Sequence, residues 1–360
     1  MSRDRPGITG DVRAAFDDCL VHADEEGAVA LTVRLLQDGV RAEDILLGLV
    51  APAQQRVGTR WASGEWTVAQ EHGATHVSER SVATVAAATP EPGPAGTAGA
   101  VLVTCSDGEW HTLPARLLAE VLRVRGFHVR FLGGHVPAAQ LVSDLHQNAP
   151  DVVALSCTLP MRLPLAHGLI QVCRPAGVPV LAGGCGFGPD GTWAYALGAD
   201  LYAPDAPTAD TLLRRQWPPP LTGEPSLDAG STEAYAHLAR HRSALLRHVV
   251  QSLHDRFPDL RDPTHRQDEA TTETLGQLLD SLAAGAFVDD PRVFIDYLSF
   301  AAAFLTARAT DPARLLAVLD FLAAPLSDSP HLARHLAAGR TWLDTHLTRP
   351  SAEHRPATGA

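Results

Sequence analysis

The sequence lacks clustered basic residues, long apolar runs and paired cysteines. Its formal net charge is −12 and no stretch concentrates Lys and Arg, which argues against direct binding of nucleic acid or of an anionic membrane surface. No apolar run reaches the roughly 20 residues that span a bilayer, and the first residues lack the apolar segment of a signal peptide. The five cysteines are scattered without a CxxC pair. Isolated thiols of this kind predict a cytoplasmic protein.

Chemical motifs of common enzyme classes are also missing. No nucleophile or acid–base pair stands out, and the first predicted strand is not followed by the GxGxxG of nucleotide-binding folds. We therefore expect a binding or sensing protein and not an enzyme.

Two stretches rich in Pro and Gly, residues 89–96 and 217–230, divide the chain of 360 residues into three blocks. Their composition is typical of linkers. With 45% hydrophobic residues overall, each block has enough apolar side chains for a core of its own. We predict three domains, over residues 1–88, 98–216 and 231–350.

The first block and the last block show helical periodicity, and the middle block does not. Leu31, Leu35 and Leu36 form one apolar face in the first block, which has the length of a four-helix bundle. In the last block, a capping residue followed by Pro predicts helix starts. These pairs are Asp290-Pro291, Asp311-Pro312 and Ser329-Pro330.

Short apolar runs alternate with helical stretches in the middle block. The runs cover residues 100–104, 129–132, 152–156 and 179–182. This alternation predicts a doubly wound parallel sheet of Rossmann-like type. The predicted fold class is therefore multidomain, α and α/β. In such sheets ligands lie at the carboxyl ends of the strands, so the loops after these runs are the candidate site.

The loop after the first predicted strand contains Glu109, Trp110, His111 and Thr112. A histidine there could point its ring over the end of the sheet. Glu109 could hydrogen-bond the other ring nitrogen, fix the tautomer and make the imidazole a better metal ligand. Taken alone, a histidine at a strand end is more often a surface or capping residue.

Small and hydroxyl-bearing residues follow the third and fourth predicted strands. Ser156 and Thr158 offer hydroxyl groups, and Gly183 with Gly184 leaves space for a bulky group against the backbone. The alternative interpretation of Gly183-Gly184 is a tight turn between strand and helix.

These loops together resemble the cobalamin-binding domains of methyltransferases, mutases and cobalamin photoreceptors. The resemblance implies that His111 is the lower cobalt ligand within a D/E-x-H-x-x-G motif and that Glu109 orients it. The final glycine of the motif is replaced here by Pro114. The loops after the third and fourth strands would surround the dimethylbenzimidazole tail. The residues concerned are Ser156, Thr158, Gly183 and Gly184.

The helical block contains a tryptophan, nine residues and a Glu-His pair: Trp61, then a segment that includes Val68, then Glu71 and His72. This pattern resembles the cobalamin-based photoreceptors, in which the bundle caps the upper face of adenosylcobalamin. An aromatic ring would shield the photolabile cobalt–carbon bond and gain contact with the adenine. The alternative interpretation is a core tryptophan beside a solvated helical pair.

Two departures from these photoreceptors bear on the output. Ala62 replaces the histidine that directly follows the tryptophan in relatives that bind DNA, so that position cannot ligate cobalt after photolysis. The sequence also begins almost directly with the bundle, without their winged-helix domain. We therefore expect no direct nucleic-acid partner, no membrane partner, and signalling through a homo-oligomer or an unidentified output protein.

The last block resembles the globin-like, phycobiliprotein-like domain of photocobilins. The resemblance implies a bilin such as biliverdin, held non-covalently because no cysteine lies beyond Cys185. Arg would pair with its propionates and a carboxylate with its pyrrole N–H groups. The candidates are His265, Asp296, Tyr297 and Arg308. A haem-binding domain or an empty interaction domain are the alternatives.

The resulting hypothesis is a photocobilin-type light sensor with two chromophores. Light would break the cobalt–carbon bond of adenosylcobalamin, and the protein would change conformation or association. The competing hypotheses are a corrinoid shuttle protein of a methyltransferase system, and a tetrapyrrole storage or interaction protein without light chemistry.

Overall fold

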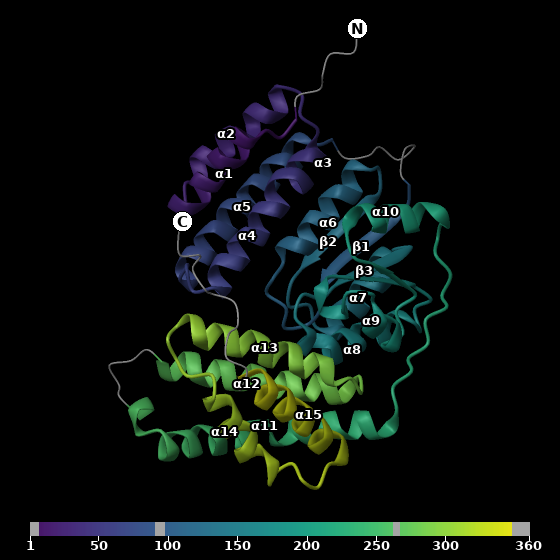
Figure 1. Cartoon of the computed structure of the whole chain (residues 1–360). Helices are drawn as coiled ribbons and strands as arrows, with labels where there is room; N and C mark the ends of the chain where they lie inside the picture. Colours follow the sequence, from purple (N-terminus) through teal and green to yellow (C-terminus); the bar gives the residue numbers. More distant parts are fainter. Residues whose placement is uncertain (1–6, 91–97, 262–266, 348–360) are drawn as a thin grey trace, which may run out of the picture. The chain divides into compact units, whose positions relative to one another are not determined.

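The computed structural model describes residues 7–90, 98–261 and 267–347. The chain divides into two compact units, Met1–Ser226 and Leu227–Ala360 (Figure 1). Within the described ranges, no helix combines the length and the apolar character that crossing a membrane requires.

Four helical segments form the N-terminal bundle, as predicted. The third segment is continuous, because α3, a π-helical turn and α4 follow one another without a break. Side chains of Thr9, Asp24 and Thr67 cap the first, second and fourth segments, as expected for these residue types. The elements are α1 (Gly10–His22), α2 (Glu25–Gln37), α3 (Ala42–Ile45), the π turn (Leu46–Val50), α4 (Ala51–Ala62) and α5 (Val68–Ala88).

The middle block forms a parallel five-stranded sheet in the order β2-β1-β3-β4-β5. The strands are β1 (Ala100–Cys105), β2 (His128–Gly133), β3 (Val152–Ser156), β4 (Val180–Gly183) and β5 (Leu201–Ala203), and the helices are α6 (Leu113–Val124), α7 (Ala138–Asn148), α8 (Leu163–Cys173), α9 (Thr192–Ala196) and α10 (Ala206–Arg215). The prediction of a parallel sheet is confirmed, with β5 in addition. Strand β3 is buried along its whole length, as expected for a parallel sheet with both faces covered.

Helix α6 joins the bundle to the sheet. Its residues Leu113, Leu117 and Val121 belong to the apolar core of the bundle, whereas Ala115 and Ala119 belong to the core on the sheet. The bundle and the sheet therefore share packed core residues and lie in one compact unit.

The C-terminal unit is helical, as predicted. Its α-helices are α11 (Ala229–Arg256), α12 (Gln267–Phe287), α13 (Pro291–Ala307), α14 (Arg314–Ala323) and α15 (Pro330–Leu347). Helix α12 contacts α11, α13 and α15, and its buried residues Leu278 and Leu282 lie in the core. Two predicted starts hold, at Pro291 and Pro330, but α14 begins at Arg314, two residues after Pro312. The globin-like assignment stays a prediction.

Candidate functional site

The strand order creates a topological switch point between β1 and β3. The chain leaves β1 towards β2 and leaves β3 towards β4, so the loops after β1 and β3 diverge at the carboxyl edge of the sheet. Ligands of doubly wound sheets bind at this position. Backbone hydrogen bonds hold the loops together, from Ser106 N to Ser156 O (2.9 Å) and from Cys157 N to Gly183 O (3.0 Å). The structure thus brings the three predicted loop motifs to one edge.

Glu109 and His111 form the polar centre of this edge. The Glu109 carboxylate is fully buried, and its Oε1 lies 2.5 Å from His111 Nδ1 and accepts the His111 backbone N–H at 3.0 Å. Its Oε2 accepts the backbone N–H groups of Thr158 (3.0 Å) and Leu159 (3.2 Å). The carboxylate is therefore fixed by groups from two loops, and it fixes the imidazole.

This arrangement decides which nitrogen of His111 is available. Because a carboxylate accepts, Nδ1 donates its proton to Glu109, and Nε2 keeps the lone pair that binds a metal. The His111 side chain is 53% exposed, so Nε2 is open to a ligand. The hydrogen bond that His111 Nδ1 donates to Glu109 is the main cause that raises the pKa of His111.

The charge state of Glu109 follows from two opposing effects. Burial alone would raise the pKa of its carboxyl group, but the hydrogen bonds from His111 and Thr158 outweigh it and lower that pKa. The carboxylate therefore stays ionised while it is buried, which suits a group that must hold an imidazole in one orientation.

Trp110 and Thr112 lie beside this centre and point to different neighbours. Trp110 is 75% exposed and stacks on His135 with the ring centroids 5.2 Å apart. The Thr112 hydroxyl donates to Glu79 Oε1 on α5 (3.3 Å). The loop is thus tied to the bundle through Thr112.

The two glycines at the end of β4 allow close packing against the neighbouring segments. A Cβ on Gly184, whose φ is +101°, would lie 2.3 Å from Cys157 O, and one on Gly183 would lie 3.0 Å from Ala203 O. The space that a Gly184 side chain would take is therefore filled by the backbone of Cys157. The Ser156 residue is buried, 5% exposed.

The two tryptophans of the capping segment differ in their environment. Trp66 is 6% exposed and belongs to the bundle core, with Arg60 stacked over its ring. Trp61, at the end of α4, is only partly buried and is absent from that core. Trp66 therefore fills the role of core aromatic, and Trp61 keeps a surface that a ligand could contact.

Glu71 links the capping helix α5 electrostatically to the histidine loop. Its charge adds to the effects that raise the pKa of His111, and its Oε2 lies 2.6 Å from His72 Nδ1. The side chain of His72 is 73% exposed, and Val68 is exposed at the start of α5. Of the predicted capping residues, Trp61 thus lies at the end of α4, and Val68, Glu71 and His72 lie on α5. Glu71 is the one whose charge acts on His111.

The sequence analysis missed Arg162, on the short 3-10 turn Pro160–Arg162. Its positive charge opposes protonation of His111 and therefore favours the neutral imidazole that binds metals. No motif singles out this arginine, because only the folded loop brings it near His111.

The three C-terminal candidates that the structure describes differ in burial and in the groups they contact. Tyr297 is buried and its hydroxyl donates to Thr274 O at 2.7 Å. Asp296 and Arg308 are exposed, and the guanidinium of Arg308 lies over the Phe304 ring. His265 lies outside the described residues.

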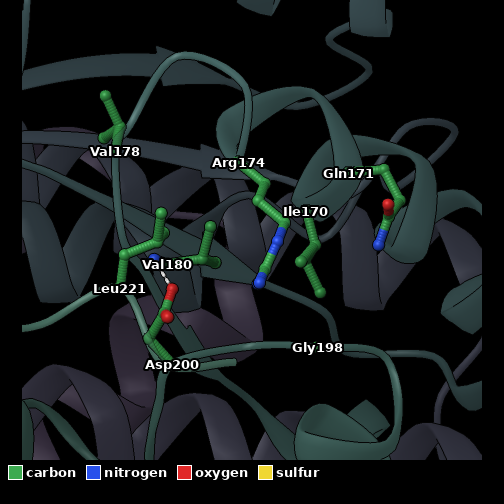
Figure 2. A pocket seen from close by; sticks show the side chains of 8 residues that line it. All are labelled: Ile170, Gln171, Arg174, Val178, Val180, Gly198, Asp200 and Leu221. Carbon is green, nitrogen blue, oxygen red and sulfur yellow. Dashed lines mark hydrogen bonds between the residues drawn. The ribbon is translucent and has the colours of Figure 1, made fainter. Parts of the chain in front are cut away.

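A small pocket lies at the amino ends of β4 and β5, away from the histidine loop (Figure 2). Its volume of about 10 Å³ suffices for a water molecule at most. The Asp200 carboxylate beside it accepts backbone N–H groups of Val180 (2.7 Å), Thr222 (2.6 Å) and Gly223 (2.7 Å). This pocket is part of the anchorage of the segment after α10 and offers no ligand site.

Two segments of the chain match family models that are described as B12 binding domains. Residues 99–211 cover the sheet with its helices, and residues 12–85 cover the bundle. The two matches identify a cobalamin-binding protein in which both parts of the N-terminal unit belong to the binding region.

Related proteins fall into two groups. The chain is 23% identical to the trimethylamine corrinoid protein of Methanosarcina barkeri over 204 residues, which are 54% of this chain and 92% of that protein. It is 31% identical to the HTH-type transcriptional repressor CarH of Myxococcus xanthus over 191 residues, which are 48% of this chain and 62% of that protein. The repressor CarA of the same organism is 30% identical, over 57% of its length.

The N-terminal fold is also found in a solved structure, that of the monomethylamine corrinoid protein of Methanosarcina barkeri. It has a TM-score of 0.50 and 20% identity, and the match covers 57% of this chain and 99% of that chain. The bundle and the sheet therefore form a known combination of domains, and the C-terminal unit is additional to it.

Proposed function

We propose that this chain is a light sensor that binds adenosylcobalamin, with His111 as the lower cobalt ligand. The observation that carries the proposal is the His111–Glu109 pair at the switch point, with Nε2 open and Nδ1 fixed at 2.5 Å from a buried carboxylate. When bound, adenosylcobalamin supplies a cobalt–carbon bond that light breaks. Glu109 fixes the orientation of the imidazole, and the positive charge of Arg162 opposes its protonation.

Trp61 supports a sensor over the competing function of corrinoid carrier. The ring is partly buried at the end of α4, and the core position of the segment is filled by Trp66. A carrier needs no aromatic cap, because the methyl group it transfers must stay accessible. The C-terminal unit supports the sensor as well, because the match to the trimethylamine corrinoid protein accounts for 54% of this chain only.

The carrier is a second candidate on one specific ground. The match covers 92% of the trimethylamine corrinoid protein, whereas the chain spans 62% of CarH and 57% of CarA. A carrier would use the same His111 loop but would not respond to light by a change in shape or association.

For the C-terminal unit we propose a bilin-binding domain that extends the absorbed range towards the red. The support is the sequence resemblance and the presence of a separate helical unit. The candidates Asp296, Tyr297 and Arg308 do not converge, so an interaction domain is the alternative. We further propose a non-enzymatic cytoplasmic protein that signals through self-association or an output protein. Biliverdin titration with a visible absorption readout separates the two: a red-shifted band supports the bilin, and its absence leaves the interaction domain.

The experiment compares Trp61→Ala with the full-length wild-type chain, both loaded with adenosylcobalamin in the dark. Trp342→Ala is the matched control, because Trp342 is also partly buried but lies in the C-terminal unit. A sensor predicts that green light changes the hydrodynamic size of the wild type and of the control, and that Trp61→Ala weakens this change. A carrier predicts no light-dependent change in any of the three proteins.

A further inference from the structure

Two aspartates and two histidines meet inside the C-terminal unit. Ligand atoms of Asp228, Asp289 and His331 lie within 4.8 Å of one another. His335 follows one turn after His331 on α15, and its Nε2 lies 3.9 Å from Asp289 Oδ1. Two histidines at i and i+4 face the same side of a helix, which is the spacing of many helical zinc ligands.

His335 provides the observation that points to a bound cation. It is 1% exposed, and its Nε2 has no hydrogen-bond partner among the described residues. Its Nδ1 lies 2.8 Å from the carbonyl oxygen of His331. A carbonyl only accepts, so Nδ1 carries the proton and Nε2 carries a lone pair.

The lone pair of His335 therefore faces the carboxylate of Asp289, and both groups are acceptors. Neighbouring His331 also has an unsatisfied ring nitrogen: its Nδ1 is buried, has no hydrogen-bond partner in the described part of the chain, and lies 3.6 Å from the same Asp289 oxygen. The buried His335 Nε2 is thus an unpaired acceptor beside an anionic oxygen, an arrangement that a cation between the two atoms would stabilise.

Arg334 is the positive group beside Asp289, but it leaves the two histidine nitrogens without a partner among the described residues. The Arg334 guanidinium contacts Asp289 from the solvent side, with 59% of its side chain exposed, and it does not reach the two histidine nitrogens. Asp228 adds a second carboxylate, which is fixed at the start of α11 by the Ser231 N–H (2.7 Å) and hydroxyl (3.0 Å).

We propose that Asp228, Asp289, His331 and His335 form a binding site for a divalent transition-metal ion of the zinc class. Two imidazoles and two carboxylates are a donor set that zinc accepts in four-coordinate sites. Ligand atoms around a tetrahedral zinc lie about 3.3 Å apart. Those of Asp228, Asp289 and His331 lie within 4.8 Å of one another, and His335 Nε2 lies 3.9 Å from Asp289 Oδ1, so side-chain movements would bring the four groups to one ion. The ion would fasten the start of α11, the turn between α12 and α13, and α15 to one another.

Gly230 leaves room for His331 beside the first turn of α11. A Cβ at this position would lie 2.5 Å from His331 Nε2 and 3.1 Å from Asp228 Oδ1. The glycine therefore lets the histidine approach the first turn of α11 closely, and a side chain there would push the two ligands apart.

The test is zinc titration of the full chain without cobalamin, by calorimetry and by measurement of metal content after gel filtration. We expect one zinc per chain. His335→Ala, and the conservative Asp289→Asn, should each weaken binding by about 100-fold or more, since loss of a group that only hydrogen-bonds a metal ligand already costs 10- to 100-fold. Position 289 has a left-handed φ of +52°, which Asn tolerates. Asp289→Asn should therefore fold normally, so the result does not depend on His335→Ala alone.

Two further variants sharpen the test. The double variant His237→Ala, His241→Ala removes a histidine pair at the same spacing on α11, and zinc binding should not change. Arg334→Gln removes the competing cation and should tighten binding a few fold. Absence of bound zinc in the wild type would overturn the proposal, and so would equal binding by the wild type, His335→Ala and Asp289→Asn.

Discussion

Replacing Glu109 by Gln should weaken cobalamin binding because the two carboxylate oxygens accept hydrogen bonds from different groups. Oε1 serves His111 through two hydrogen bonds, and Oε2 serves the backbone N–H groups of Thr158 and Leu159. A glutamine has one acceptor oxygen and one NH₂ group, so it can satisfy only one of these sides.

Each orientation of the amide has a definite consequence. If its oxygen faces the backbone, the NH₂ group faces His111 Nδ1, which must then accept. The proton moves to Nε2, and the histidine cannot bind cobalt. If the oxygen faces His111, two part-buried N–H groups lose their acceptor, at about 1–2 kcal/mol each. We expect a 10- to 100-fold loss of cobalamin affinity and a loss of about 2–4 kcal/mol in the free energy of unfolding.

The matched control for Glu109→Gln is Glu120→Gln. Glu120 is also buried, 1% exposed, but pairs with Arg116 and Arg123 on α6. It should lose stability while keeping cobalamin affinity and histidine ligation. Affinity comes from equilibrium titration, ligation from the absorption spectrum, and stability from chemical denaturation. Normal affinity and an unchanged histidine-ligated spectrum in Glu109→Gln would refute the reasoning.

Three further outcomes follow. Gly184→Ala should lower the free energy of unfolding by at least about 2 kcal/mol in chemical denaturation, because its φ is +101° and the new Cβ meets Cys157 O; unchanged stability would show that the loop adapts. Tyr297→Phe should cost about 1 kcal/mol, the loss of its hydrogen bond to Thr274, and should leave any biliverdin absorption band unshifted; a shifted band would place the hydroxyl at the bilin. Burial lowers the pKa of His167 below 6.5, so near that pH the unfolded chain binds a proton that the folded chain does not. The free energy of unfolding should therefore fall as the pH decreases below about 6.5. A His167→Gln variant whose free energy of unfolding has the same pH dependence would contradict this.

The sequence predicts the strands well where they are long and apolar. The runs at residues 129–132 and 179–182 lie within one residue of β2 and β4, and residues 152–156 coincide with β3. Strand β5 has only three residues, too few for a periodic pattern to emerge. The shared core at α6 was also beyond prediction, because its two apolar faces serve two neighbours.

The candidate site was predictable in part. Glu109 and His111 lie two residues apart, and the structure contains the hydrogen bond that this spacing predicts. The second half of the Glu109 environment consists of backbone N–H groups from another loop, which carry no side-chain signal. Gly184 was ambiguous for a related reason, since the sequence does not show whether the space beside a glycine is filled by a ligand or by Cys157.

The C-terminal unit shows the limit of sequence reasoning more clearly. The candidates Asp296 and Tyr297 are adjacent in sequence but differ in burial, one exposed and the other buried. By contrast, Asp228, Asp289 and His331 are far apart in sequence and meet only in the fold. Polar residues in helices therefore predict a site poorly until tertiary contacts are known.

The measurement that tests the central claim most directly is the absorption spectrum of the full chain loaded with adenosylcobalamin, before and after green light. The account predicts that the dark protein has alkyl-cobalamin bands, that light abolishes them, and that His111→Ala changes the dark spectrum. A dark protein that takes up no adenosylcobalamin, or one whose spectrum is unaffected by light, would contradict the account.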